Sequence, residues 1–280
     1  MSHINKVINL HRIDDTNIGD YYSSPARYFS FPDCIASHRE ILNIEPEDLR
    51  DKHVILGGGG LLDQWFMPAF RKIHKSRPAK LVAWGVGQQL DNDHWYSQHH
   101  QFDYKSYLST FDLVGIRDYG YSHTWVPCAS CLNSAFDKAR DIKHEFVVFS
   151  HKNRPIPIRG FPYMTNETND LNDVLDFLGS GDTILTSSYH GVYWALLLNR
   201  KVLAFPFNSK FLTLKQAPAI YPARWKSKSF LGRFRNGQHE LEMVKGWRIL
   251  AGAARNYPEA LDECRDANQR FYSNVLNIIK

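Results

Sequence analysis

Short apolar segments recur along the chain, and each is followed at once by glycines or by polar residues. "KVINL" (6–10) precedes "TNIGD", "HVIL" (53–56) precedes four glycines, and "KLVAWGVG" (80–87) precedes a pair of glutamines. Longer stretches between these segments have the apolar spacing of helices. This alternation is typical of a parallel α/β fold. Because the carboxyl ends of parallel strands meet at one edge of a sheet, we expect a ligand to bind there.

A second series of the same kind begins near residue 145. "EFVVFS" (145–150) precedes the basic segment "HKNRPIP", and "DTILTSS" (182–188) leads into a helix-like stretch before "RKVLAFPF" (200–207). The 280 residues suffice for two domains of about 140 residues each. We therefore predict two α/β halves, an N-terminal one over residues 1–138 and a C-terminal one over residues 139–280.

The C-terminal part departs from this alternation. Residues 212–237 contain prolines and little periodicity, and they predict a basic loop. From residue 239 onward we predict helix. Apolar residues near the end recur every three or four positions, at Leu261, Cys264, Ala267, Phe271, Val275 and Ile278. This spacing predicts a terminal helix that packs one face on the body of the protein.

Charge and hydropathy narrow the partners and the location. The net charge of +5 favours anionic ligands but does not indicate nucleic acid. The apolar run "VYWALLL" is far shorter than the ~20 residues of a membrane-spanning helix. The N-terminus shows no signal-peptide pattern, so we expect a cytoplasmic protein. The basic and aromatic segment 224–235 predicts either a plain surface loop or a peripheral contact with the anionic inner face of a membrane.

The segment "TSSYHG" (186–191) places a histidine where a strand passes into a helix. The helix N-terminus offers free amides, Ser187 and Ser188 offer hydroxyls, and His190 offers a titratable proton. These groups suit an anion that must be protonated. His190 could equally cap the helix or bond a backbone carbonyl, and the segment alone does not decide between these interpretations.

Cations follow neighbouring strands of the same half. Lys210 lies past the strand at 200–207, and His151 and Arg154 lie past the strand at 145–150. In the first half, Arg117 ends a strand, where its guanidinium could grip a carboxylate or phosphate or could pair with Asp118. The convergence of these groups on one rim favours an anion-binding site.

Two loops of the first half complete the set. Asn17 and Asp20 follow the first strand, and Asp20 could accept a proton from a sugar hydroxyl or could cap the next helix, which pattern alone favours. Gly58 and Gly59 belong to a run of four glycines that could open a helix toward a ligand or could serve tight packing.

The cysteine pair "CASC" lacks the second pair that a structural zinc site requires. We therefore predict that Cys128 and Cys131 pack a turn, and we expect no metal site.

Several segments together are similar to one known family. "NIGD", "GGGG" after a strand, "WGVG", "IRDYGYS" and "TSSYHG" followed by "ALLLNRKVLAFP" occur in the order of the polysaccharide pyruvyl transferase family, which the chain resembles. The resemblance implies two Rossmann-like halves that face a cleft, as in B-type glycosyltransferases. It also implies transfer of a pyruvate ketal from phosphoenolpyruvate to a sugar of a cell-surface glycan or exopolysaccharide, or to a lipid-linked oligosaccharide. Such chemistry needs no cofactor beyond phosphoenolpyruvate as co-substrate.

The resemblance also assigns roles. His190 would contact the donor and protonate it, and Asn17 and Asp20 would face the acceptor. Many members carry an arginine where this chain has Ser188, so the missing charge would come from Arg117, Lys210 or Arg154. This departure keeps two alternatives open. One is a glycosyltransferase that uses a nucleotide-sugar in the same cleft, and the other is a non-catalytic glycan-binding member.

Overall fold

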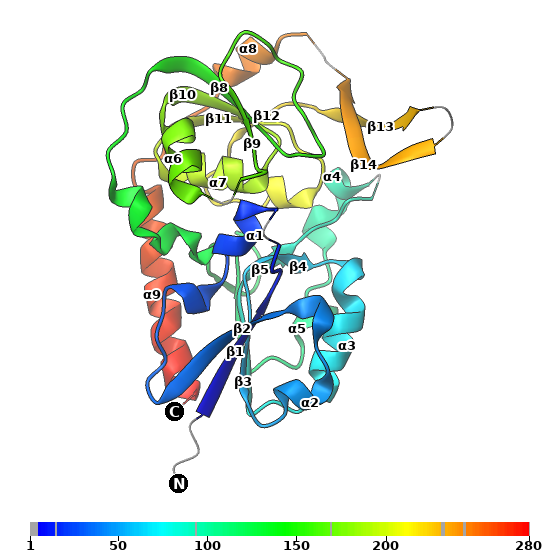
Figure 1. The fold of residues 1–280 in the computed structure, drawn as a ribbon, viewed down its shortest axis with the longest axis vertical. Helices are drawn as coiled ribbons and strands as arrows, with labels where there is room; N and C mark the ends of the chain where they lie inside the picture. Colours follow the sequence, from blue (N-terminus) through cyan, green and yellow to red (C-terminus); the bar gives the residue numbers. More distant parts are fainter. Residues whose placement is uncertain are drawn as a thin grey trace.

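Two parallel sheets carry the fold, one in each half of the chain (Figure 1). The computed structural model describes residues 5–14, 16–92, 94–168, 170–230, 233–242 and 245–279, and within residues 228–238 it describes the backbone alone. The mixed α/β class that the sequence predicts is confirmed.

The first sheet has the strand order β2-β1-β3-β5-β6-β7, with β4 paired to β5, and these pairs are parallel. Helices α2 (Pro46–Leu49), α3 (Met67–Lys75) and α5 (Lys105–Leu108) belong to this half. The strands are β1 (Asn5–His11), β2 (Cys34–Glu40), β3 (His53–Leu56), β4 (Gly59–Leu62), β5 (Lys80–Gln88), β6 (Leu113–Ile116) and β7 (Thr124–Trp125). The predicted strands at 6–10, 53–56 and 80–87 are thus confirmed.

The second sheet has the order β12-β11-β10-β8-β9, again parallel. Helix α6 (Leu171–Gly179) packs against β8 and β10, and helix α7 (Tyr189–Leu197) has nine buried residues, because its sequence is apolar on every side. The strands are β8 (His144–Ser150), β9 (Tyr163–Thr165), β10 (Gly181–Thr186), β11 (Lys201–Ala204) and β12 (Ala219–Ile220).

The four glycines do not open a helix, contrary to one of the two interpretations above. They pass from β3 into the short strand β4, and the next α-helix begins at Met67. A side chain at Gly57 would place its Cβ 2.1 Å from the carbonyl oxygen of Trp84, and one at Gly58 would place it 2.6 Å from that of Ser23. Close backbone packing therefore accounts for these two glycines.

The terminal helix α9 (Ala260–Ile278) runs along both halves, from the upper to the lower part of Figure 1. Near its start, Ala260 and Cys264 join the core around α7, and near its end Phe271 and Val275 pack with Trp84 of the first sheet. The predicted apolar face is confirmed, with Leu261 and Ile278 only half-buried.

The predicted loop over residues 212–237 is wrong in its second part. Strands β13 (Arg224–Phe230) and β14 (Arg233–Glu242) form an antiparallel hairpin, so helix also does not begin at residue 239; α8 (Trp247–Ala251) follows the hairpin. The hairpin pairs Trp225 with Leu241 and is held to the sheet where Trp225 Nε1 donates to the carbonyl of Pro206 over 2.9 Å. Trp225 and Leu241 therefore anchor the strand pair. The prolines of this segment, Pro218 and Pro222, lie before the hairpin, and the strands were missed because their basic and polar residues show no regular apolar pattern.

The side chains of Lys228, Arg233 and Arg235 lie outside the described residues, so contact of this segment with a membrane stays a prediction. In the described part of the chain, none of the helices combines the length and the apolar character needed to cross a bilayer.

Candidate anion-binding site

A pocket of about 390 Å³ lies between the two halves and takes its walls from both. Helix α1 (Ile18–Tyr22) and the ends of β5 and β6 contribute from the first half, and the ends of β8, β10 and β11 contribute from the second. The structure thus brings together predicted residues from five separate segments. These are Asn17, Asp20, Arg117, His151, Arg154, Ser188, His190 and Lys210.

His190 lies in the first turn of α7 and is 8 % exposed. It does not cap the helix; the N-cap is Ser188, whose hydroxyl accepts a hydrogen bond from the amide of Gly191. The imidazole Nε2 lies 3.5 Å from Cys128 Sγ, and the ring packs 5.0 Å from the Trp194 ring. Burial, and then the positive charge of Arg117 and Lys210, lowers the pKa of His190 well below its usual value, so the ring is neutral in this pocket.

Gly19 of α1 leaves the space that His190 occupies. A Cβ at Gly19 would lie 2.0 Å from Nδ1 of the imidazole and 2.6 Å from its Cγ. The two residues belong to different halves, so the glycine of "NIGD" and the histidine of "TSSYHG" meet face to face. Glycine is required at position 19 for this close approach.

Arg117 is the most deeply buried cation of the pocket, at 3 % exposure. Its guanidinium lies 4.1 Å from the centre of the Tyr189 ring, and among the described residues its Nε and Nη2 have no hydrogen-bond partner. The alternative pairing with Asp118 is wrong: the Asp118 carboxylate accepts hydrogen bonds from Tyr104, Thr213 and the amide of residue 88. Buried N–H groups left without partners are costly, so they point to a ligand with acceptor oxygens.

Lys210 stands on the turn η7 (Ser209–Phe211) after β11. Its Nζ donates to Gln89 Oε1 over 3.2 Å and lies 5.3 Å from the centre of the Phe207 ring. Burial, followed by repulsion from Arg117, lowers the pKa of Lys210 to about 8, although Asp20 acts in the opposite direction. Because a group with a pKa near 8 is still mainly protonated at pH 7, Lys210 joins Arg117 as a positive charge next to the neutral His190.

Ser187 holds the segment that follows β8 through two hydrogen bonds to its backbone. This serine is fully buried, and its hydroxyl accepts from the amide of His151 over 2.9 Å and donates to the carbonyl of Arg154 over 2.5 Å. It does not line the pocket, so the structure gives Ser187 a supporting position instead of the predicted place beside the donor. The hydroxyl shapes the loop that carries the two basic residues.

His151 and Arg154 both line the pocket. His151 Nδ1 accepts from the amide of Asn153 over 3.1 Å, so in the neutral ring the proton lies on Nε2. Burial, followed by the charge of Lys210, lowers the pKa of His151 to about 3. His151 is therefore an uncharged donor at neutral pH, and Arg154, with its guanidinium 4.9 Å from the Phe207 ring, is the charged residue of this loop that lines the pocket.

Asn17 and Asp20 form the opposite wall. Asp20 lies inside α1 and does not cap it, which overturns the interpretation that pattern alone favours. Asn17 donates to the Asp20 carboxylate over 2.8 Å and accepts from Asn166 of the other half over 3.2 Å. Burial raises the pKa of Asp20, while Lys210 opposes that shift. A carboxylate of raised pKa beside a polar pocket has the properties of a proton acceptor.

Gly58 and Gly59 do not line the pocket, whereas Gly60 does. Gly58 faces Ser23, and Gly59 has a positive φ of 103° that favours glycine. The glycine of this run that reaches the pocket is therefore Gly60, because the run passes into β4, and acceptor contacts stay a prediction. Several lining residues have no signal in the sequence beyond being polar or aromatic and following a strand: Arg12, Gln89, Asn153, Asn166, Tyr189 and Phe207.

Cys128 and Cys131 are fully buried next to the pocket, as the packing interpretation predicts. Burial raises the pKa of both thiols, so they stay protonated.

The comparison with family models adds a separate line of evidence. The model described as polysaccharide pyruvyl transferase matches residues 2–209, and this range contains every predicted site residue except Lys210. The chain belongs to the polysaccharide pyruvyl transferase family. No curated protein and no solved structure matches the chain. The resemblance drawn from the order of the segments is thus confirmed, and the hairpin, α8 and α9 lie beyond the matched range.

Proposed function

We propose that this member of the polysaccharide pyruvyl transferase family uses phosphoenolpyruvate as its donor and forms a pyruvate ketal on two hydroxyls of a glycan sugar. The pocket between the two Rossmann-like halves is then the catalytic cleft, arranged as in B-type glycosyltransferases. The observation that carries the proposal is the buried Arg117 guanidinium, whose Nε and Nη2 have no hydrogen-bond partner among the described residues, in the same pocket as Lys210. Phosphoenolpyruvate carries a phosphate and a carboxylate, the two groups that such cations bind best.

Ser188 replaces the arginine that many members carry, and the pocket offers a physical substitute. Its hydroxyl caps α7 and thereby keeps the helix N-terminus directed at the pocket. Arg117 and Lys210 supply the positive charge from the other side. Together the helix end and the two cations suit a phosphate without an arginine at position 188.

His190 acts as the general acid, and it takes up the proton for this role when the donor binds. Burial and the charges of Arg117 and Lys210 hold the imidazole neutral. The negative charges of phosphoenolpyruvate offset the repulsion from Arg117 and Lys210, so the imidazole takes up a proton when the donor binds. That proton passes to the methylene carbon of the enol, and C2 becomes cationic.

Asp20 serves as the base on the acceptor side. A sugar hydroxyl forms a bond to C2 of the donor, and the C2–O bond to phosphate breaks with its electron pair leaving on phosphate. A second hydroxyl replaces the phosphate at C2 and closes the ketal ring. Asp20, held by Asn17, accepts the proton of the first hydroxyl, and its raised pKa suits that role. The proton of the second hydroxyl passes to the departing phosphate, which leaves as hydrogen phosphate.

Donor binding is tested with Arg117→Met, measured by calorimetry with phosphoenolpyruvate. Removing the guanidinium should weaken binding at least a hundredfold, because a buried charged hydrogen-bonding partner is lost. Arg27→Met is the matched control, since the Arg27 guanidinium also lies over a tyrosine ring, at 3.8 Å, but outside the pocket. Equal affinity of the Arg117 variant and the control would refute the donor site.

Turnover is tested by phosphate release from phosphoenolpyruvate in the presence of candidate sugars. Release should require an acceptor with two suitably placed hydroxyls and should be lost in His190→Ala. Binding of UDP or GDP without binding of phosphoenolpyruvate would instead indicate a nucleotide-sugar glycosyltransferase. Glycan binding without affinity for any donor would indicate a non-catalytic member.

A further inference from the structure

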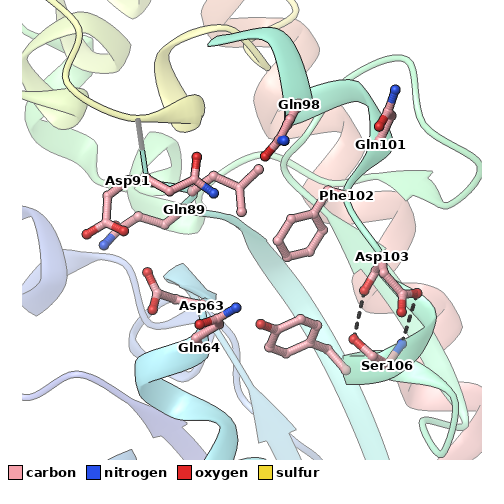
Figure 2. Close-up of a pocket in the computed structure, with 12 residues that line it drawn as sticks. Asp63, Gln64, Gln89, Asp91, Gln98, Gln101, Phe102, Asp103 and Ser106 are labelled. Atoms are coloured by element: carbon pink, nitrogen blue, oxygen red, sulfur yellow. Dashed lines mark hydrogen bonds between the residues drawn. The ribbon is translucent and has the colours of Figure 1, made fainter. Parts of the chain in front are cut away.

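A second pocket of about 370 Å³ adjoins the first one on the N-terminal half (Figure 2). Gln89 lines both pockets, and its Oε1 accepts the hydrogen bond from Lys210. The turn η3 (Gln64–Phe66) also joins them, because Gln64 lines the second pocket and Phe66 lines the first. A chain molecule that leaves the first pocket along this wall therefore enters the second directly.

The second pocket is lined by groups that recognise hydroxyls. Carboxylates and side-chain amides line it from β4–η3, from the segment after β5 and from α4 (Trp95–Gln98) with η4 (His99–Gln101), as Figure 2 shows for Asp63, Asp91 and Gln98. Within the described part of the chain, the side-chain amides of Gln64 and Gln98 form no hydrogen bond to another residue, so their donors and acceptors are open to a ligand. Amides and carboxylates are the side chains best able to accept and donate to several hydroxyls at once.

Aromatic rings accompany these polar groups. Phe102 lines the pocket and stacks on Tyr107, with 5.5 Å between ring centres. Trp65, on the turn shared by the two pockets, is 72 % exposed, and Tyr96 of α4 is 62 % exposed. Large rings left in solvent beside a polar pocket are suited to the apolar faces of sugar rings, which present C–H groups between their hydroxyls.

The charge of the second pocket differs from that of the first. Asp63, Asp91 and Asp103 contribute acidic groups, whereas no lysine or arginine lines it, and among the described residues none of the three forms an ion pair within 4.0 Å. The second pocket would repel an anionic ligand, whereas Arg117 and Lys210 in the first pocket would attract it. The two pockets thus separate an anion from an uncharged, hydroxyl-rich molecule.

We propose that the second pocket binds neutral sugar units of the glycan chain, beyond the sugar that receives the pyruvate. The inference rests on the proposed function for the identity of the reacting sugar, but glycan binding can be measured without turnover. Neutral sugars fit because the walls combine hydroxyl-binding amides, the ring of Phe102 and acidic groups that disfavour uronic acids, and because the exposed Trp65 lies next in the chain to the lining residue Gln64.

Direct binding measurements test this inference. Methyl glycosides of glucose, galactose and mannose are compared by calorimetry with the β-1,4-linked tetrasaccharides of the same sugars, and tetragalacturonate serves as the charged probe. At least one neutral tetrasaccharide should bind ten times more tightly than its methyl glycoside, since it gains several hydrogen bonds and a stacked ring. Tetragalacturonate should bind at least ten times more weakly than tetragalactose. Failure of every neutral tetrasaccharide to gain over its methyl glycoside overturns the proposal, as does tighter binding of tetragalacturonate.

Variants locate the binding. The double change Gln64→Ala and Gln98→Ala, and separately Trp65→Ala, should remove the tenfold gain of the tetrasaccharide without affecting the methyl glycoside. Gln269→Ala on the exposed face of α9 and Ile249→Ala, which truncates a side chain 82 % exposed, are the matched controls. An unchanged gain in the pocket variants overturns the assignment.

Turnover separates the two hypotheses. A tetrasaccharide that binds through Gln64 and Gln98, together with no phosphate release from phosphoenolpyruvate, would reject the proposed function and support the glycan site. Phosphate release that is equally fast with mono- and tetrasaccharides, in wild type and variants alike, would support the proposed function and reject the glycan site.

Discussion

Replacing Gly19 by alanine tests the contact that joins the two halves at the site. The new Cβ would lie 2.0 Å from His190 Nδ1, about 1.4 Å short of the 3.4 Å at which ordinary contact begins. Cys128 lies 3.5 Å from Nε2 of the ring and Trp194 packs on its face, so the ring is blocked on these two sides. The clash is therefore relieved only if α1 moves away from α7 or if the ring turns into the pocket that it lines.

Two opposing contributions determine how Gly19→Ala changes the free energy of unfolding, and the clash is the larger one. Alanine normally stabilises a helix by about 0.5–1 kcal/mol relative to glycine. Overpacking a filled site costs about 1–3 kcal/mol. We expect a net loss of roughly 1–2 kcal/mol in the free energy of unfolding of Gly19→Ala, together with a loss of donor affinity because α1 also carries Asp20.

A double-mutant cycle with His190→Ala isolates the contact. Once the ring is removed, Gly19→Ala should cost nothing and should even gain about 0.5–1 kcal/mol, which gives a coupling of about 2 kcal/mol in urea denaturation. Gly252→Ala is the control, because the nearest atom to its Cβ lies 3.3 Å away and its φ is negative at −63°. A coupling near zero would show that the two residues are not in contact and would refute the reasoning.

Three further predictions follow from the site and the core. The pKa of Lys210 is lowered from 10.5 to about 8, so the affinity of the pocket for anions should fall as the pH rises through 8. Lys210→Met should remove that pH dependence in calorimetric titrations. The unfolded chain holds this proton up to higher pH, so between pH 8 and 10.5 the free energy of unfolding of wild type should rise relative to that of Lys210→Met. A constant difference between the two proteins over this range would contradict the depressed pKa. Ser187→Ala leaves the amide of His151 and the carbonyl of Arg154 without their partner, and it should cost about 1–3 kcal/mol in urea denaturation, with an unchanged midpoint as the contrary result. A thiol reagent should react with the half-buried Cys34 in the native protein. It should react with the three buried cysteines only in denaturant, and their reaction in the native protein would contradict their burial: Cys128, Cys131 and Cys264.

Periodicity located the central strands and failed at the edges. β1, β3, β5, β8, β10 and β11 are buried runs of branched and aromatic residues, and such runs are recognisable from near neighbours alone. Strand β2 was missed because most of its seven residues are exposed, so its sequence has no apolar pattern. Strand β4 was missed because two of its four residues are glycines.

The residues of the site also divide into those that local pattern predicts and those that depend on distant contacts. The sequence placed His190, Arg117 and Lys210 after strands, and parallel topology made their convergence predictable. It could not choose between alternatives that depend on distant partners. Arg117 and Asp118 are neighbours in the chain, yet the carboxylate bonds to Thr213, 95 residues away, and the guanidinium is left to the pocket.

The sequence by itself determined the α/β class, the family and the set of polar groups at the strand ends, because these depend on local pattern and on the order of short segments. Only the tertiary structure decided that Ser187 supports a loop, that Asp20 lies within α1, and that Gly19 makes room for His190. Each of these outcomes depends on a contact between segments far apart in the chain. Which of two possible partners a polar side chain takes is decided by the packing that brings one of them within hydrogen-bond distance.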